Sequence, residues 1–413
     1  MPAPEIVLLV VAVLLLVSIL ASKLGGRLGL PGLLVFLVIG MLAGSDGPGG
    51  IWFDNYALAQ FVGTVALVFI LYTGGLSTRW QTVRPILWPG LSLATLGVLL
   101  TMLLTGAFAK WVLGWGWLEA LLLGAVVSST DASAVFSVLR ERSVALKRRV
   151  RPLLEFESGI NDPMAVFLTV GLTLLLTQPE RPLWSIVPFF LQQMVLGLAL
   201  GYAFGLGTVW LIRRLHLSSA GLYAVLSITL MLLGFSATAV LGGSGFLAVY
   251  VMGVVVAGSD FMQKAPLVSF HEGITYLMEI GMFLTLGLLV FPSQLPPIAG
   301  AALLISLFLM LLGRPLSVFL SMALTPMPLA DKALVSWVGL RGAIPIILAT
   351  FPLLAGVRVA QDIFNITFFI VLTSVLLQGT TLAVVARWLG VSVEERDRAA
   401  QGGRGPAGEQ GTD

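Results

Sequence analysis

Acidic and amide side chains stand in a stretch of sequence that is otherwise long and apolar enough to cross a bilayer. Residues 153–176 read LLEFESGINDPMAVFLTVGLTLLL, and Glu157, Asn161 and Asp162 lie in the first half. Ser158 and Asp162 are four residues apart and share one face of a helix, while Glu157 and Asn161 share the adjacent stripe. A charge at the centre of a bilayer costs about 2.5–3.5 kcal/mol on insertion scales. These oxygen-bearing side chains therefore predict a site for a cation or a proton.

Two further charges stand inside apolar segments, each beside residues that interrupt a helix. Asp131 lies in SSTDAS, where hydroxyl side chains compete for backbone hydrogen bonds, so a break at Thr130 and Asp131 is expected. Arg341 lies in LVSWVGLRGAIPIILATF, where Gly342 and Pro345 predict a second break. A pair of interrupted membrane helices is the best sequence indication of a transporter binding site.

The composition makes lipid the main solvent of this chain. Of its 413 residues, 58% are hydrophobic and 10% are charged, whereas soluble domains carry about 25% charged residues. The absence of cysteine excludes disulfides, thiol catalysis and Cys-ligated metal. No basic run interleaved with aromatic residues indicates nucleic-acid binding. The apolar runs predict an all-α polytopic membrane protein with about thirteen transmembrane helices. The predicted helices span 5–22, 30–44, 56–76, 85–109, 117–139, 152–177, 184–212, 219–241, 244–258, 272–291, 298–320, 331–353 and 361–388.

The basic residues fall on alternate loops, as thirteen spans require. One side collects 19 of the 23 Lys and Arg residues, the other side has only Lys110, Arg181 and Arg358, and Arg341 lies inside a helix. Basic loops stay in the cytoplasm, which predicts an outside N-terminus and a cytoplasmic C-terminus. No basic residue precedes the first apolar segment, so we expect a retained membrane helix there and no cleaved signal peptide.

An odd number of helices indicates an internal repeat. Helices 1–6 and 8–13 would form two six-helix units of opposite orientation, joined by helix 7, which is the usual plan of transporters. The broken fifth and twelfth helices then occupy equivalent places. This membrane domain covers residues 1–390. The remaining residues, 391–413, are rich in glycine and charge and are predicted to form a short disordered cytoplasmic tail.

The chemistry of these side chains suits the exchange of positive ions. Potassium and sodium prefer oxygen ligands, and carboxylates, hydroxyls and the carbonyls of broken helices supply them at the bilayer midplane. A carboxylate in a partly desolvated site can hold a proton or a cation near neutral pH, but not both. If the loaded site moves between the two faces and the empty charged site does not, exchange becomes obligatory. The sequence therefore predicts a secondary transporter that needs no cofactor and is not an enzyme.

Other interpretations of these residues are open from the sequence. Glu157 and Arg341 could form a purely structural ion pair, and Glu279 in the tenth helix could be an accessory acid or a second ion-pair partner. The GGSG motif around Ser244 matches a protease nucleophile pattern, but the predicted topology puts His271 on the opposite side of the membrane. A channel would also use oxygen-lined breaks, although no repeated filter loop is evident.

Three separated segments resemble the signature stretches of the NhaP-type monovalent cation:proton antiporters: SSTDASAVFSVL, LEFESGINDPMAVFLT and SWVGLRGAIPIILATFPLLAG. The resemblance covers about residues 5–390 and is closest to the bacterial potassium/proton antiporters once named cell volume regulation protein A. FLVIGMLAGSDGPGGIWFDNY and GGSGFLAVYVMGVVVAG fit the same subgroup. The resemblance implies a homodimer in the lipid of the cell (inner) membrane. Each subunit would have a dimer domain that supports a mobile six-helix core bundle moving as an elevator.

The same resemblance implies roles for individual residues. Asp162 would be the carboxylate that binds the ion and the proton, and Asn161 would be its partner. Ser158 and the break at Thr130 and Asp131 would complete the site, with the monovalent cation held at Asp162, Asp131, Ser158 and Thr130.

Glu157 would pair with Arg341 to brace the site. The sequence also departs from the family pattern, because Ala132 stands where a proline is common and Thr73 stands near a position that is often acidic. Members of the subgroup commonly carry a soluble C-terminal regulatory region, whereas this chain ends soon after the thirteenth helix. Asn161 stands where a related electrogenic class has a second aspartate. A single exchanging carboxylate predicts electroneutral one-for-one exchange of potassium, or alternatively sodium, for protons.

Overall fold

The thirteen predicted apolar segments all fold as helices in the computed structural model, which describes residues 3–28, 32–78, 80–147, 149–262 and 264–394. In this part of the chain, eight helices are long and apolar enough to cross a membrane, and four shorter apolar helices accompany them. The shorter helices include the halves of the predicted broken helices, which explains why they fall below full membrane length. The prediction of an all-α polytopic protein with broken fifth and twelfth helices is confirmed.

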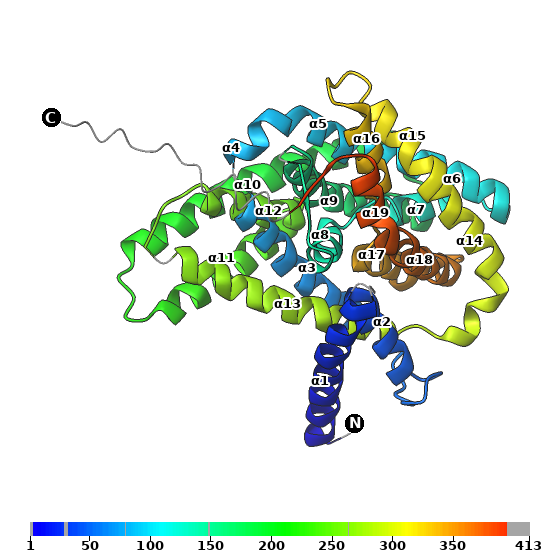
Figure 1. The fold of residues 1–413 in the computed structure, drawn as a ribbon, viewed down its shortest axis with the longest axis horizontal. Helices are drawn as coiled ribbons and strands as arrows, with labels where there is room; N and C mark the ends of the chain where they lie inside the picture. Colours follow the sequence, from blue (N-terminus) through cyan, green and yellow to red (C-terminus); the bar gives the residue numbers. More distant parts are fainter. Residues whose placement is uncertain (1–2, 29–31, 79, 148, 263, 395–413) are drawn as a thin grey trace.

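One group of helices comes from the start and the middle of the chain. In this first group α3 packs on α12 and α13, α2 packs on α13, and α11 packs on α12. Figure 1 shows α1 projecting from the rest of the molecule, with α11 and α13 lying together on one side. The first group consists of α1 (Pro4–Leu28), α2 (Gly32–Ala43), α3 (Tyr56–Ser77), α11 (Ala220–Val240), α12 (Gly245–Ala257) and α13 (Lys264–Leu288).

A second group holds both interrupted helices. Here α9 packs on α7 and α17, and α18 packs on α14 and α17. The N-terminal members are α4 (Trp80–Val83), η1 (Arg84–Ile86), α5 (Leu87–Ser92), η2 (Leu93–Gly97), α6 (Val98–Leu113), α7 (Trp117–Val126), α8 (Ala132–Glu141) and α9 (Val150–Thr177). The C-terminal members are α14 (Ala299–Phe308), η6 (Leu309–Gly313), α15 (Arg314–Ser321), α16 (Leu329–Trp337), α17 (Ala343–Leu354), α18 (Ala360–Ser374), η7 (Val375–Gly379) and α19 (Thr380–Trp388).

A long helix joins the two groups. The short turn η3 (Leu183–Ser185) leads into α10 (Ile186–Arg214), which corresponds to the predicted seventh helix and packs on α11 and α12. Two further short turns, η4 (Pro292–Gln294) and η5 (Pro296–Ile298), connect α13 with α14. The two groups meet where α3 and α13 contact α17 and where α12 contacts α9.

Pairs of glycines let the helices of the first group approach closely. A Cβ atom on Gly75 of α3 would lie 2.3 Å from the carbonyl oxygen of Tyr250, and one on Gly253 of α12 would lie 2.4 Å from that of Tyr72. Any side chain at either position would therefore push α3 and α12 apart. Small residues at such contacts are the usual means of packing membrane helices, because lipid gives no hydrophobic drive for association.

The start of the predicted disordered tail is ordered, which corrects that part of the prediction. Ser392–Glu394 forms a strand, β2, that pairs antiparallel with β1 (Val144–Leu146) in the connection between α8 and α9. The amide of Lys147 also donates to the carbonyl oxygen of Val391 at 3.0 Å. Composition favours disorder here, but the backbone groups of β1 offer a hydrogen-bonding edge. The rest of the predicted tail lies outside the described residues.

Candidate ion-binding site

The two interrupted helices cross in the middle of the second group. The chain leaves α7 at Val126 and starts α8 at Ala132, and it leaves α16 at Trp337 and starts α17 at Ala343. At the crossing, the amide of Asp131 donates to the carbonyl oxygen of Leu340 at 2.8 Å. The breaks fall where the hydroxyl-rich stretch and the glycine predicted them. Four helix ends, whose terminal backbone groups have no partner within their own helix, thus converge inside the bundle.

Charged side chains stand at two of these helix ends. The Oδ1 atom of Asp131 accepts from the amide of Ala134 at 3.0 Å and from the hydroxyl of Ser133 at 2.7 Å, which caps α8. The Nη1 atom of Arg341 donates to the carbonyl oxygens of Ser128, at 2.7 Å, and of Ser129, just beyond the end of α7. An anion at a helix N-terminus and a cation near a C-terminus both oppose the helix dipole. The two charges therefore stabilise the broken conformation.

Helix α9 supplies the side chains that meet the first break. The Ser158 hydroxyl donates to the carbonyl oxygen of Thr130 at 2.9 Å and accepts from the amide of Ala132 at 3.2 Å. The amide of Asn161 donates to the Thr130 hydroxyl at 2.7 Å. The structure thus brings the break at Thr130 and Asp131 together with Ser158 and Asn161, and Asp162 follows Asn161 in the chain.

Asp162 itself is buried and incompletely hydrogen-bonded. Its side chain is 3% exposed, and among the described residues no donor reaches its Oδ1 atom. Asp131 and Glu157 are acidic neighbours that act on it electrostatically. Buried polar atoms without a partner are rare and need an explanation. A carboxylate with free lone pairs, next to a hydroxyl and the carbonyls of a broken helix, can take a monovalent cation or a proton.

The expected pairing of Glu157 with Arg341 is wrong. Glu157 Oε1 instead accepts from Nη2 of Arg314 at 2.5 Å, and both side chains are 1% exposed. In the partition of charges predicted from the sequence, Arg314 is one of the 19 basic residues of the cytoplasmic side. In the structure Arg314 is the first residue of α15, directly after the π-helical segment η6, and its side chain is buried. Arg341 is occupied by the carbonyls of the first break.

A second network, which the sequence analysis missed, holds the other break. The amide of Arg341 donates to the Ser374 hydroxyl at 3.1 Å, and that hydroxyl donates to Oε1 of Gln378 at 2.6 Å. Gln378 in turn donates to the carbonyl oxygen of Trp337, the last residue of α16, at 2.9 Å. A glutamine and a serine four residues apart in an apolar helix are the signal that would have indicated this role.

Gly342 is packed directly against the Asp131 carboxylate. A Cβ atom at this position would lie 1.9 Å from Oδ2 of Asp131. The φ angle of Gly342, −94°, suits any residue, so the absence of a side chain is what matters.

We expect the substitution Gly342→Ala to displace the Asp131 carboxylate and to lower the transport rate by roughly tenfold or more. The matched control is Gly171→Ala in α9, where a Cβ atom would meet nothing within 4 Å. Transport assays on both purified variants would check this. An unchanged rate in Gly342→Ala would mean that the Asp131 position does not matter.

The residues of the rival protease interpretation do not come together. Ser244 caps α12 by accepting from the amide of Leu247 at 3.3 Å. His271, which lies just before the predicted span 272–291, is fully buried within α13, where its Nε2 atom is 3.0 Å from the Ser227 hydroxyl. Among the described residues, no group of three His, Cys, Asp or Glu side chains is placed to hold a metal ion.

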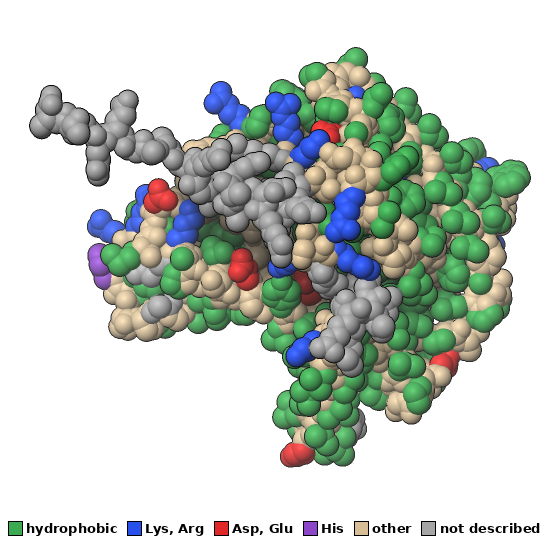
Figure 2. Space-filling view, in the orientation of Figure 1, with side chains coloured by type: hydrophobic (Ala, Val, Ile, Leu, Met, Phe, Trp, Pro, Cys, Tyr) green, Lys and Arg blue, Asp and Glu red, His purple; other side chains and the backbone are tan. Residues whose placement is uncertain are grey.

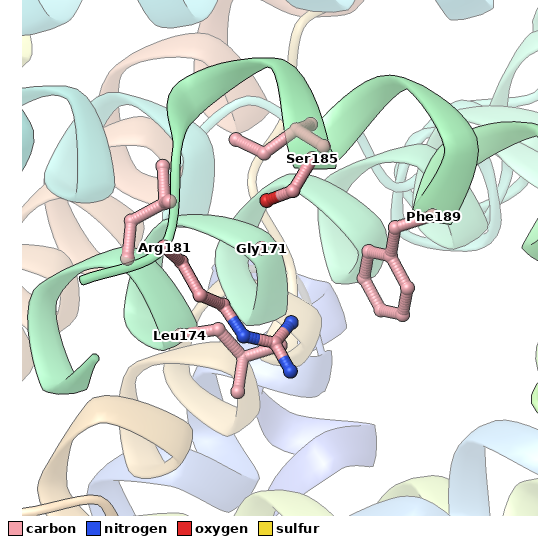
Figure 3. Close-up of a pocket in the computed structure, with 7 residues that line it drawn as sticks. Gly171, Leu174, Arg181, Ser185 and Phe189 are labelled. Atoms are coloured by element: carbon pink, nitrogen blue, oxygen red, sulfur yellow. The ribbon is translucent and has the colours of Figure 1, made fainter. Parts of the chain in front are cut away.

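A small cavity of about 10 Å³ lies away from the crossing, between the end of α9 and the start of α10. Figure 3 shows the Arg181 side chain extending between Leu174 and Phe189. This volume is close to that of one water molecule, and the lining contains none of the expected site residues. The lining residues are Gly171, Leu174, Leu175, Arg181, Ser185, Ile186 and Phe189.

Comparison with known proteins gives one family. Residues 10–388 match the family model described as sodium/hydrogen exchanger, transmembrane. The chain is 46% identical over 393 residues to the K(+)/H(+) antiporter NhaP of Alkalimonas amylolytica, which covers 95% of this chain and 68% of that protein. It is 46% identical over 383 residues to the K(+)/H(+) antiporter NhaP2 of Shewanella sp. strain ANA-3, covering 92% of this chain and 66% of that protein. The chain thus spans about two thirds of the length of these relatives.

More distant relatives agree with this result. The Na(+)/H(+) antiporter ApNhaP of Aphanothece halophytica is 27% identical over 355 residues, covering 80% of this chain and 64% of that protein. The solved structure of the sodium proton antiporter MjNhaP1 from Methanocaldococcus jannaschii at pH 8 superposes with a TM-score of 0.80 at 23% identity, covering 93% of this chain and 99% of that one. This likeness shows the same fold. With the family model matching nearly the whole membrane part, this chain belongs to the sodium/hydrogen exchanger family of transmembrane transporters.

Proposed function

We propose that this protein exchanges potassium for protons across the cell membrane, with Asp162 as the group that binds either ion. The observation that carries the proposal is the buried Asp162 carboxylate, whose Oδ1 atom has no hydrogen-bond donor among the described residues. Thr130, Asp131 and Ser158 supply further oxygens at the crossing, and Asn161 fixes the Thr130 hydroxyl. The names of the relatives that are 46% identical favour potassium, and the more distant relatives keep sodium as the alternative.

The cycle follows from competition for one carboxylate. A cation that enters from one side displaces the proton of Asp162, and the loaded site moves to the other side, where a proton displaces the cation. We infer that the second group of helices moves as the elevator against the first, because the two groups are each held by their own internal contacts. The empty charged site stays in place, since an unpaired carboxylate is costly to carry through the apolar interface.

We further propose that the protein is a homodimer in the cytoplasmic (inner) membrane. Its N-terminus would lie outside and its C-terminus inside. The projecting helix α1 packs within the chain against α2 and α13 and exposes large apolar side chains, among them Leu8, Leu9 and Leu16, which lipid or a second subunit would cover. The orientation is supported by the basic side chains, many of which gather on the face turned to the viewer in Figure 2.

The test is proton flux in proteoliposomes that receive potassium, sodium or lithium in turn. Potassium is expected to dissipate an imposed pH gradient. The membrane potential should neither drive the exchange nor change its rate, because one charge crosses in each direction. A steady current that follows the potential would show that the one-for-one count is wrong. Cation flux that is independent of protons would indicate a channel instead.

A further inference from the structure

Glu279 is an intramembrane carboxylate that the site does not use. It lies on α13, in the first group of helices, whereas Asp131 and Asp162 belong to the second group. It is half-buried, and in the described part of the chain no basic side chain lies within 4 Å of it. An acid inside a membrane segment is costly, and by default it indicates function.

The side chains that face Glu279 come from α8. It interacts with Ser133 and electrostatically with Asp131 and Arg140. Arg140 also donates from Nη1 to the hydroxyl of Tyr276 at 3.2 Å, and Tyr276 lies one turn before Glu279 on the same face of α13. Helices α8 and α13 are therefore joined through Arg140 and Tyr276, and Glu279 lies one turn further along α13.

Ser133 connects Glu279 with the ion-binding crossing. Its hydroxyl donates to Oδ1 of Asp131 at 2.7 Å, which leaves the lone pairs of the hydroxyl oxygen available to a cation. Ser133 is exposed and Asp131 is partly exposed, whereas Asp162 is 3% exposed. Figure 2 shows the surface hollowed between the part formed by α11 and α13 and the remaining helices, with acidic side chains beside the hollow. An ion that arrives from the surface therefore meets the more exposed Glu279, Ser133 and Asp131 before the buried Asp162.

We propose that Glu279 recruits the transported cation, holding it together with the Ser133 hydroxyl and the Asp131 carboxylate before it reaches Asp162. This inference rests on the proposed antiport function and adds a residue to its access path. The chemistry is that of the main site, since two carboxylates and a hydroxyl offer the oxygen ligands that a monovalent cation takes. Arg140 is the opposing charge, and its bond to Tyr276 holds it beside the carboxylate.

The position of Glu279 makes its effect specific to one side of the membrane. It is carried by the first group of helices, so it faces Asp131 only in the conformation described here. In the proposed topology α8 runs from the crossing toward the cytoplasm, and Ser133 and Arg140 lie along this half. Glu279 therefore acts on cations that arrive from the cytoplasm and loses contact with the site once the second group has moved outward.

The experiment measures the potassium concentration for half-maximal exchange on each side separately. The chain has no cysteine, so a single cysteine added on one face, together with an impermeant thiol reagent, allows one orientation to be selected in proteoliposomes. We expect Glu279→Gln to raise the cytoplasmic KM for potassium about tenfold, which corresponds to about 1.4 kcal/mol. The KM on the outer side and the maximal rate should stay close to wild type. Glu279→Asp, which keeps the charge, should show a smaller shift on the same side.

The matched control is Glu272→Gln, which makes the same change on the same helix at an exposed position. It should leave both KM values unchanged. An equal rise in KM on both sides, or no rise with either Glu279 variant, would overturn the inference while the antiport activity of the wild type stands. If the wild type shows no proton-coupled potassium or sodium flux, the proposed function falls and this inference falls with it.

Discussion

Replacing Asp162 with asparagine is expected to abolish proton-coupled cation exchange and to leave the protein folded. Asparagine has nearly the same shape but can neither lose a proton nor neutralise a cation. The carboxylate is buried at the crossing, with its Oδ1 atom unbonded among the described residues, so packing does not depend on its charge. We expect the exchange rate to fall by about two orders of magnitude or more, while the thermal stability stays equal or rises.

The measurement combines flux in proteoliposomes with thermal unfolding of the purified variant. A matched control is Asp362→Asn, which makes the same change at an exposed position in the first turn of α18. This control should transport normally. If Asp162→Asn retained normal exchange, the assignment of the ion-binding carboxylate would be wrong, and Asp131 would become the next candidate.

Breaking the pair of Glu157 and Arg314 is expected to produce the largest loss of stability. Both side chains are 1% exposed, and removal of one partner leaves an uncompensated charge in the bundle. Such losses are typically about 3–5 kcal/mol. Glu157→Gln and Arg314→Gln should each lower the free energy of unfolding by an amount of this order. The double variant should recover part of the loss, since it leaves no charge unpaired.

A double-mutant cycle on the thermal unfolding of the purified protein checks this prediction. The matched control is Glu155→Gln, which breaks the more exposed pair of Arg151 and Glu155 one turn apart on α9 and should cost less than about 1 kcal/mol. Additive losses from Glu157 and Arg314 would argue against a direct pair. A strong coupling of Glu157 to Arg341 in the same assay would instead restore the pairing inferred from the sequence.

The sequence alone determined the membrane fold and the location of its interruptions. Each segment that crosses the lipid must satisfy its own backbone hydrogen bonds and carry few charges. A run of apolar residues therefore indicates a membrane span without information about the other helices. The breaks at Thr130–Asp131 and Arg341–Gly342 are also local, because hydroxyl side chains and glycine weaken a helix wherever they occur. For the same reason Asp162 stood out as an acid without a local partner.

The tertiary structure decided which groups meet. Two buried arginines, Arg314 and Arg341, could each have neutralised Glu157, and nothing in the sequence spacing separates them. Packing of α15 against the bundle brings Arg314 to Glu157, while the crossing of the broken helices gives Arg341 two carbonyl oxygens to bind. Charges act over the distances between helices, and these distances depend on packing.

The remaining differences have the same origin. The predicted span 272–291 leaves out His271 because a lone histidine carries no local signal, but α13 buries it against Ser227. Ser392–Glu394 reads as the start of a disordered tail, yet it finds a strand partner about 250 residues earlier in the chain. Glu279 was ambiguous until α8 was seen to face it. The free-energy cost of placing a given residue in lipid or in a helix can therefore be predicted from the sequence. The choice of interaction partner depends on contacts between distant segments, which only the folded chain brings together.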